Sequence, residues 1–110
     1  MEEQTDKFEM NALELIQLKD IKLTQRTKAY YDLNEKEREL KKEETRLLLE
    51  TDFKGLGLTN EKQRTSYVNE ATASLKTLID EIRFAVKQDE NDLEIINDLI
   101  KLRLMEVKTE

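Results

Sequence analysis

Hydrophobic residues recur every three to four positions along most of the chain, which is the spacing of helices packed along a heptad seam. In the first half, Ile16, Leu23 and Tyr30 lie seven residues apart, and so do Leu33, Leu40 and Leu47. The second half repeats the spacing at Val68, Ala71, Leu75, Leu78, Ile82, Ala85 or Val86, Leu93, Ile96, Ile100 and Val107. Neither half alternates with the period of two that a half-buried strand requires. The pattern therefore predicts an all-α fold.

One turn signal interrupts this pattern, the tripeptide Gly55-Leu56-Gly57. Two glycines in three residues disfavour helix. Asn60 and Gln63 then have the spacing of a capping box, which starts a helix. We predict one domain over residues 1–110, with a first helix over about 5–51, a turn over 52–59 and a second helix over about 60–107.

If the chain reverses near Leu56, residue i lies opposite residue 112 − i. This register pairs Leu33 with Ile79, Tyr30 with Ile82, Ile16 with Ile96, Ala12 with Ile100 and Phe8 with Leu104. Apolar residues meet at all five levels, which indicates a long antiparallel helical hairpin of the coiled-coil type. The same register places two polar segments, residues 24–28 and 88–92, opposite each other. Either the hairpin has a polar layer there, or both helices bend.

Several apolar residues lie partly outside a single seam, and they leave two alternatives open. They are Leu13, Leu18, Ile21, Ile79, Ile95, Leu99 and Leu102. They either wrap the same core or form a second surface, because burying each such side chain is worth roughly 1.5–3 kcal/mol. We favour the second surface, which predicts a protein partner or a homo-oligomer such as a dimeric four-helix bundle.

The amino-acid composition limits the kinds of catalysis and metal binding that the chain can carry out. The chain has no cysteine and no histidine, so the usual thiolate nucleophile, general base and metal ligands are missing. We expect no enzyme activity, no metal and no cofactor. We expect the carboxylate groups Glu35-Glu39 and Asp89-Glu90-Asp92-Glu94 to face water or to pair with lysines on the same helix. The net charge is −6, and the longest aliphatic run, Leu47 to Leu49, is far too short for a membrane span. We expect a cytoplasmic protein without a membrane partner.

Two groups of residues are candidate contact surfaces. Phe53, Leu56 and Leu58 place three large apolar groups in the turn, where they either close the end of the hairpin or dock a partner. A basic stripe, defined here as Lys19, Lys22, Arg26 and Lys28, precedes Tyr30 and Tyr31. Such a stripe either faces water or binds nucleic acid or an acidic protein, with the tyrosines stacking on bases.

The turn also resembles a known group of proteins. Thr51-Asp52-Phe53-Lys54, the run Gly-Leu-Thr-Asn-Glu-Lys over residues 57–62, and then Arg64, Tyr67 and Val68 resemble small helical early-region proteins of temperate phages of Gram-positive bacteria. Most of that group have no assigned activity, and the resemblance implies a phage origin without transferring any catalytic residue.

We therefore expect a non-enzymatic phage accessory protein that modulates or inhibits a host or phage protein through protein–protein contact. One alternative is a nucleic-acid-binding accessory of replication or recombination that uses the basic stripe. Another is an acidic inhibitor that mimics DNA through residues such as Asp89, Glu90 and Asp92.

Overall fold

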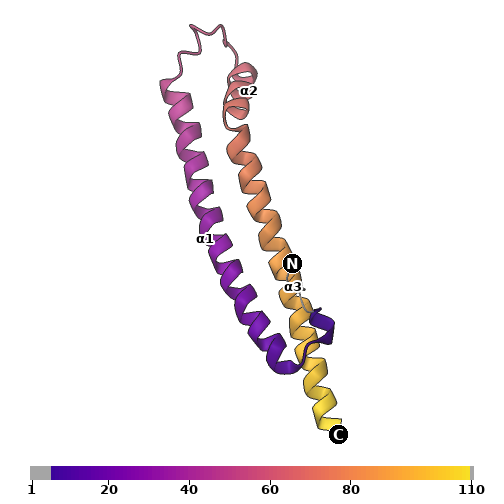
Figure 1. Cartoon of the computed structure of the whole chain (residues 1–110). Coiled ribbons are helices and arrows are strands. Elements are labelled where there is room, and N and C mark those ends of the chain that lie inside the picture. The colour runs from indigo at the N-terminus through magenta and orange to yellow at the C-terminus, as the bar shows by residue number, and fades with distance from the viewer. Residues whose placement is uncertain (1–5, 110) are drawn as a thin grey trace, which may run out of the picture. The chain divides into compact units, whose positions relative to one another are not determined.

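The chain folds as helices, as Figure 1 shows. This computed structural model describes residues 6–109, with side chains to residue 107. A short 3-10 helix η1 (Lys7–Glu9) is followed by α1 (Ala12–Glu50), α2 (Glu61–Ala71) and α3 (Ala73–Thr109), and residues 6–109 contain no strand. The predicted all-α helical hairpin is confirmed, whereas its assembly into a four-helix bundle stays a prediction.

The first helix begins later than predicted. Thr5 lies outside the described residues, but a helix over residues 6–11 is wrong, because Asn11 caps α1 instead. The Asn11 side-chain oxygen accepts from the Glu14 N–H at 2.9 Å, and the Glu14 carboxylate accepts from the Asn11 N–H at 3.2 Å, which is a capping box. Residues 6–11, called the N-terminal arm below, carry η1, which Asp6 caps through the Phe8 N–H.

The second predicted helix is two helices, because Thr72 separates α2 from α3 with φ −104° and ψ 5°. Its side chain is only 1% exposed, and its hydroxyl donates to the Val68 carbonyl at 2.8 Å. A buried threonine satisfies its hydroxyl on the preceding turn of the helix, and this contact disturbs regular helix geometry. At the start of α2, the predicted capping box of Asn60 and Gln63 is confirmed.

The described chain forms two compact units. Unit 1 combines residues 6–30 with residues 85–109. Its core cluster consists of Leu15, Ile96 and Leu99, with Met10, Leu18 and Ile100 packed against it. Arg103 of α3 donates to the carbonyl oxygens of Met10 at 3.0 Å and Phe8 at 2.6 Å. Near the ends of the chain, residues i and about 112 − i thus meet, as the antiparallel register predicts, whereas Tyr30 of the same unit meets Glu90 instead of residue 82.

The helix face that enters this core differs from the prediction. Leu15 is fully buried, whereas Ile16 is 44% exposed and Tyr30 is 40% exposed. Leu15, rather than Ile16, is therefore the residue of α1 that belongs to the core cluster with Ile96, and Phe8 and Leu104 are both at least half exposed. Neighbouring helix positions point about 100° apart, so choosing Leu15 turns Ile16 toward the flank. Leu99, which we placed outside the seam, belongs to the core.

Unit 2 comprises residues 31–84. Its buried side chains are Leu47, Val68, Thr72 and Ile79, so Ile79 is another core residue that the sequence analysis placed partly outside. Leu33 and Leu40 are half-buried, which confirms this predicted heptad row together with Leu47. An ion pair of 3.1 Å between Glu37 of α1 and Arg83 of α3 joins the two helices within the unit.

Because Leu15 is buried and Ile16 is partly exposed, alanine substitutions at these two neighbouring positions should differ in their effect on stability. Leu15→Ala should lower the free energy of unfolding by about 2–5 kcal/mol, because it leaves a cavity in a filled core. Ile16→Ala should cost clearly less, because that side chain is already 44% exposed. Urea unfolding followed by circular dichroism measures both variants. Equal losses would contradict the assignment of Leu15, rather than Ile16, to the core.

Candidate functional site

Lys22 of the basic stripe faces the acidic segment of α3 in unit 1. The Lys22 ammonium lies 3.2 Å from an Asp92 oxygen and 3.9 Å from an Asp89 oxygen. Residues 24–28 lie within α1 and residues 88–92 within α3, and neither helix is interrupted there. The contact of Lys22, which precedes the first segment, with Asp89 and Asp92 agrees with the polar-layer alternative. Thr24 and Thr27 fit into α1 because their hydroxyls donate to the carbonyls of Asp20 and Leu23.

A second polar contact lies beside this layer. The Tyr30 hydroxyl donates to the Glu90 carboxylate. This hydrogen bond raises the pKa of Tyr30 above its ordinary value of 10.0, with smaller contributions from desolvation and from the charge of Glu90, while Arg26 acts in the opposite direction. The contact holds Tyr30 at the flank of the helix pair, where its ring is 40% exposed.

These contacts engage most of the charged groups that the sequence singled out. Lys22 pairs with Asp89 and Asp92, and Glu90 pairs with Tyr30. Lys19 and Arg26 are half-buried, and Lys28 is exposed. One residue of the stripe proposed for phosphate, Lys22, thus pairs with two of the acids proposed as a DNA mimic, Asp89 and Asp92.

The connecting loop, residues 51–60, is fixed by its own hydrogen bonds. The Asp52 carboxylate accepts from the Gly55 N–H at 3.0 Å, and the Leu58 N–H donates to the Phe53 carbonyl at 2.8 Å. Gly57 has φ +74°, a left-handed conformation that glycine adopts at little cost. A Cβ on Gly55 would overlap the Asp52 carboxylate. The backbone conformation therefore favours glycine at position 57, whereas a side chain at position 55 would displace the Asp52 carboxylate from its contact with the residue-55 N–H.

The three apolar side chains of this loop have different surroundings. Phe53 packs edge-on against Tyr67, with ring centroids 5.9 Å apart and an interplanar angle of 88°, and Leu58 is half-buried. Leu56 is 56% exposed. Two further exposed leucines precede the loop, Leu48 and Leu49. The sequence held a signal for them, because only one residue of the run Leu47-Leu48-Leu49 can face a narrow seam.

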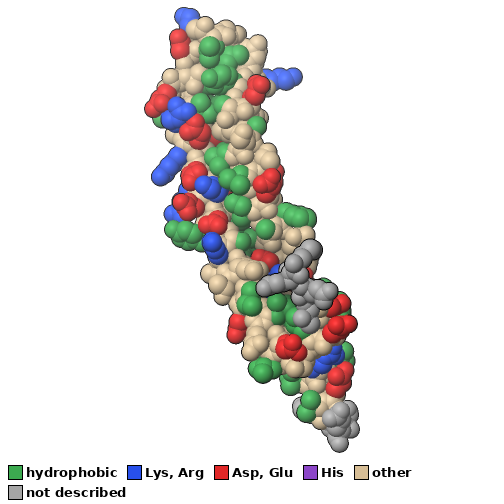
Figure 2. All heavy atoms as spheres, viewed as in Figure 1, with side chains coloured by type: hydrophobic (Ala, Val, Ile, Leu, Met, Phe, Trp, Pro, Cys, Tyr) green, Lys and Arg blue, Asp and Glu red, His purple; other side chains and the backbone are tan. Residues whose placement is uncertain are grey.

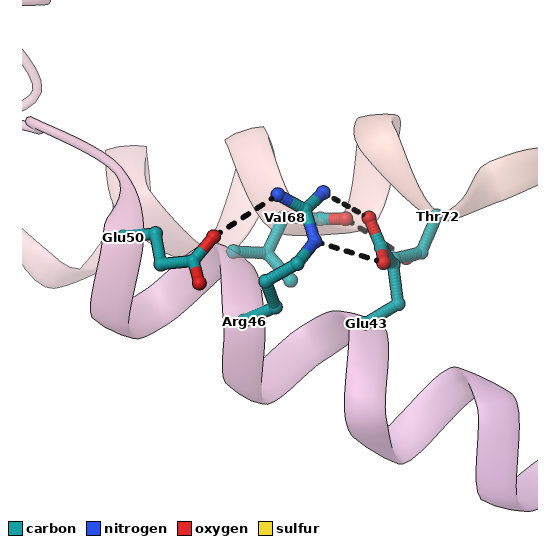
Figure 3. Close-up of polar contacts among 5 residues, drawn as sticks. All are labelled: Glu43, Arg46, Glu50, Val68 and Thr72. Atoms are coloured by element: carbon teal, nitrogen blue, oxygen red, sulfur yellow. Dashed lines mark hydrogen bonds and ion pairs between the residues drawn. The ribbon is translucent and has the colours of Figure 1, made fainter.

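Arg46 forms the densest ionic contact of unit 2, as Figure 3 shows. Its guanidinium binds Glu43 and Glu50, one turn away on either side along α1. The hydrogen bond from Arg46 lowers the pKa of the Glu43 carboxyl, and the same contact raises the pKa of Arg46. Pairs at i, i+3 and i, i+4 on an exposed helix face contribute little to stability. The cluster is a surface network rather than a reactive site.

Over residues 6–109, no group of three or more acidic side chains is placed to hold a metal ion. None of the described helices is both long enough and apolar enough to span a membrane. The chain matches none of the protein-family models, curated proteins or solved structures with which it was compared.

The Tyr30–Glu90 contact predicts a pH effect. A raised pKa in the folded state means that the hydrogen bond stabilises the fold below the ordinary pKa of tyrosine, and that this stability is lost as the pH rises through the folded value. In a Tyr31→Phe/Tyr67→Phe background, tyrosinate absorbance should show Tyr30 ionising at higher pH than in the same background carrying Glu90→Ala. Identical titration curves would contradict the contact.

Proposed function

We propose that this protein is a non-enzymatic interaction protein whose connecting loop docks on a protein partner. The observation that supports this most is Leu56, an apolar side chain that is 56% exposed on a loop held by the contacts of Asp52 and Phe53. A loop that is ordered before binding loses little conformational entropy when it docks. Leu48 and Leu49, also exposed, extend the apolar surface available near the loop.

Composition supports the absence of catalysis in this proposal. Without histidine or cysteine, acid–base or nucleophilic chemistry would depend on carboxylates, lysines or hydroxyls with strongly shifted pKa values. The carboxylates that lie closest to cationic side chains are already engaged in ion pairs, Glu43 with Arg46 and Asp92 with Lys22. The resemblance of the loop to early-region phage proteins adds that the partner is a host or phage protein in the bacterial cytoplasm.

If the connecting loop docks on a partner, we expect the contact to depend on the exposed side chain of Leu56. Leu56→Asp should weaken capture of the partner at least about tenfold, because truncated or charged anchors at an interface centre commonly cost more than 1.4 kcal/mol. Immobilised protein is incubated with lysate of a Gram-positive bacterium, and the captured protein is then titrated with each variant.

The matched control is Leu13→Asp, which places the same charge on an exposed leucine of unit 1. It should leave capture unchanged, and circular dichroism should show equal helix content in both variants. Equal capture by wild type and by Leu56→Asp would overturn the proposed role of the loop.

A further inference from the structure

Arg103 of α3 ties the N-terminal arm, residues 6–11, to the helix pair of unit 1. Its Nε donates to the Met10 carbonyl at 3.0 Å, and its Nη2 donates to the Phe8 carbonyl at 2.6 Å. The remaining Nη1 lies 3.4 Å from a carboxylate oxygen of Glu106. A guanidinium presents its donors in a rigid, planar fork, so this one side chain binds two carbonyls of the arm at once. Figure 1 shows the arm in indigo beside α3.

Met10 adds an apolar contact to this attachment. Its half-buried side chain packs against the core cluster of Leu15, Ile96 and Leu99. The 3-10 helix η1 has no buried residue, and Phe8 within it is 57% exposed. Figure 2 shows hydrophobic side chains lying between charged ones on the visible surface, so an exposed hydrophobic residue in the arm is ordinary. The arm is thus attached at its last residues and exposed along η1.

The hydrogen bonds on either side of the junction between η1 and α1 are local. In the arm, the Phe8 N–H donates to the Asp6 carboxylate at 3.0 Å. At the start of α1, Asn11 and Glu14 form their own capping box. Met10 lies between these two pieces in an extended conformation, with φ −74° and ψ 145°. Both pieces can therefore keep these hydrogen bonds when the arm leaves α3.

We propose that the N-terminal arm is a strap that opens and closes over this side of unit 1 while α1 and α3 stay packed, and that Arg103 holds it closed. Segments with few buried apolar contacts and exposed backbone hydrogen bonds open at a lower free-energy cost than the core. The arm lies in unit 1 and the connecting loop in unit 2, so the strap does not depend on the proposed function.

Opening of the strap changes what solvent and solutes can reach. The closed arm contributes Asp6, Lys7 and Met10 to the wall of a hollow of about 550 Å³, whose opposite side includes Ile21 of α1 and Ile96 of α3. When the arm leaves, this wall is removed, and the part of the core cluster that Met10 covers is uncovered. The strap therefore controls access to the hollow.

Cysteine labelling measures the opening, because the chain has no cysteine of its own. In the full chain, Met10→Cys should react with a maleimide more slowly than Met105→Cys, whose position is 63% exposed. Adding Arg103→Ala should raise the labelling rate at position 10 at least about fivefold, because the two hydrogen bonds from a charged donor are lost.

Two controls separate opening of the strap from loss of the fold. Val86→Cys lies at a position of the same unit that is only 6% exposed, and its labelling rate should not change with Arg103→Ala. Lys101→Ala removes an exposed cation from the same turn of α3 and should leave the rate at position 10 unchanged. Circular dichroism should show equal helix content in both alanine variants.

Three results would overturn the proposal. The first is a labelling rate at position 10 that is the same with and without Arg103→Ala. The second is equal acceleration at positions 10 and 86, which would mean that the whole helix pair opens. The third is equal acceleration by Lys101→Ala, which would assign the effect to charge rather than to the hydrogen bonds of Arg103.

Discussion

The contact of Leu15 with Ile96 and Leu99 fixes the first unit of this protein. Two packed helices touch along one narrow line, so each turn contributes about one side chain to the core. Once Leu15 occupies that line, the rotation of α1 is set. Lys22 then faces Asp89 and Asp92, and Ile16 is left on the flank. The same register brings Arg103 to the carbonyl oxygens of the N-terminal arm.

Features encoded by a few neighbouring residues were predictable from the sequence. The turn required only Gly55 and Gly57, and the start of α2 required only Asn60 and Gln63. The register that the turn predicts holds near the ends of the chain, where Arg103 meets Met10, but not nearer the turn, where Tyr30 meets Glu90 and Glu37 meets Arg83. The face of α1 was not predictable, because Leu15 and Ile16 are adjacent and equally apolar, and only their distant partners on α3 decide between them. The start of α1 at Asn11 was missed although Asn11 and Glu14 have capping-box spacing, because the heptad count passes through that point without a break.

In the candidate site too, contacts between residues that are distant in the sequence were harder to predict than local features. In the sequence, Lys22 and Asp92 belong to separate groups that suggest opposite ligands, phosphate for one and a DNA-binding protein for the other. Taken alone, neither group shows its partner, although the register that pairs residue i with residue 112 − i places residue 22 opposite residue 90 and so brings Lys22 close to Asp89 and Asp92. The place of the loop was easier to predict, because Gly55 and Gly57 mark it locally, whereas the exposure of Leu56 was left open by the sequence. The hydrogen bonds from Arg103 to the N-terminal arm could not be predicted from the sequence, because their acceptors are backbone carbonyl oxygens, which every residue carries.

The division into two units has a consequence for how the chain folds. Unit 2 is one continuous stretch, residues 31–84, whereas unit 1 joins segments from both ends of the chain. Contacts between residues close in sequence form fastest, and the entropy cost of closing a loop rises with its length. Leu15 and Ile96 therefore meet most cheaply after unit 2 has shortened the effective loop between them. Nucleation near the loop, followed by zipping toward the termini, is the order that this topology favours.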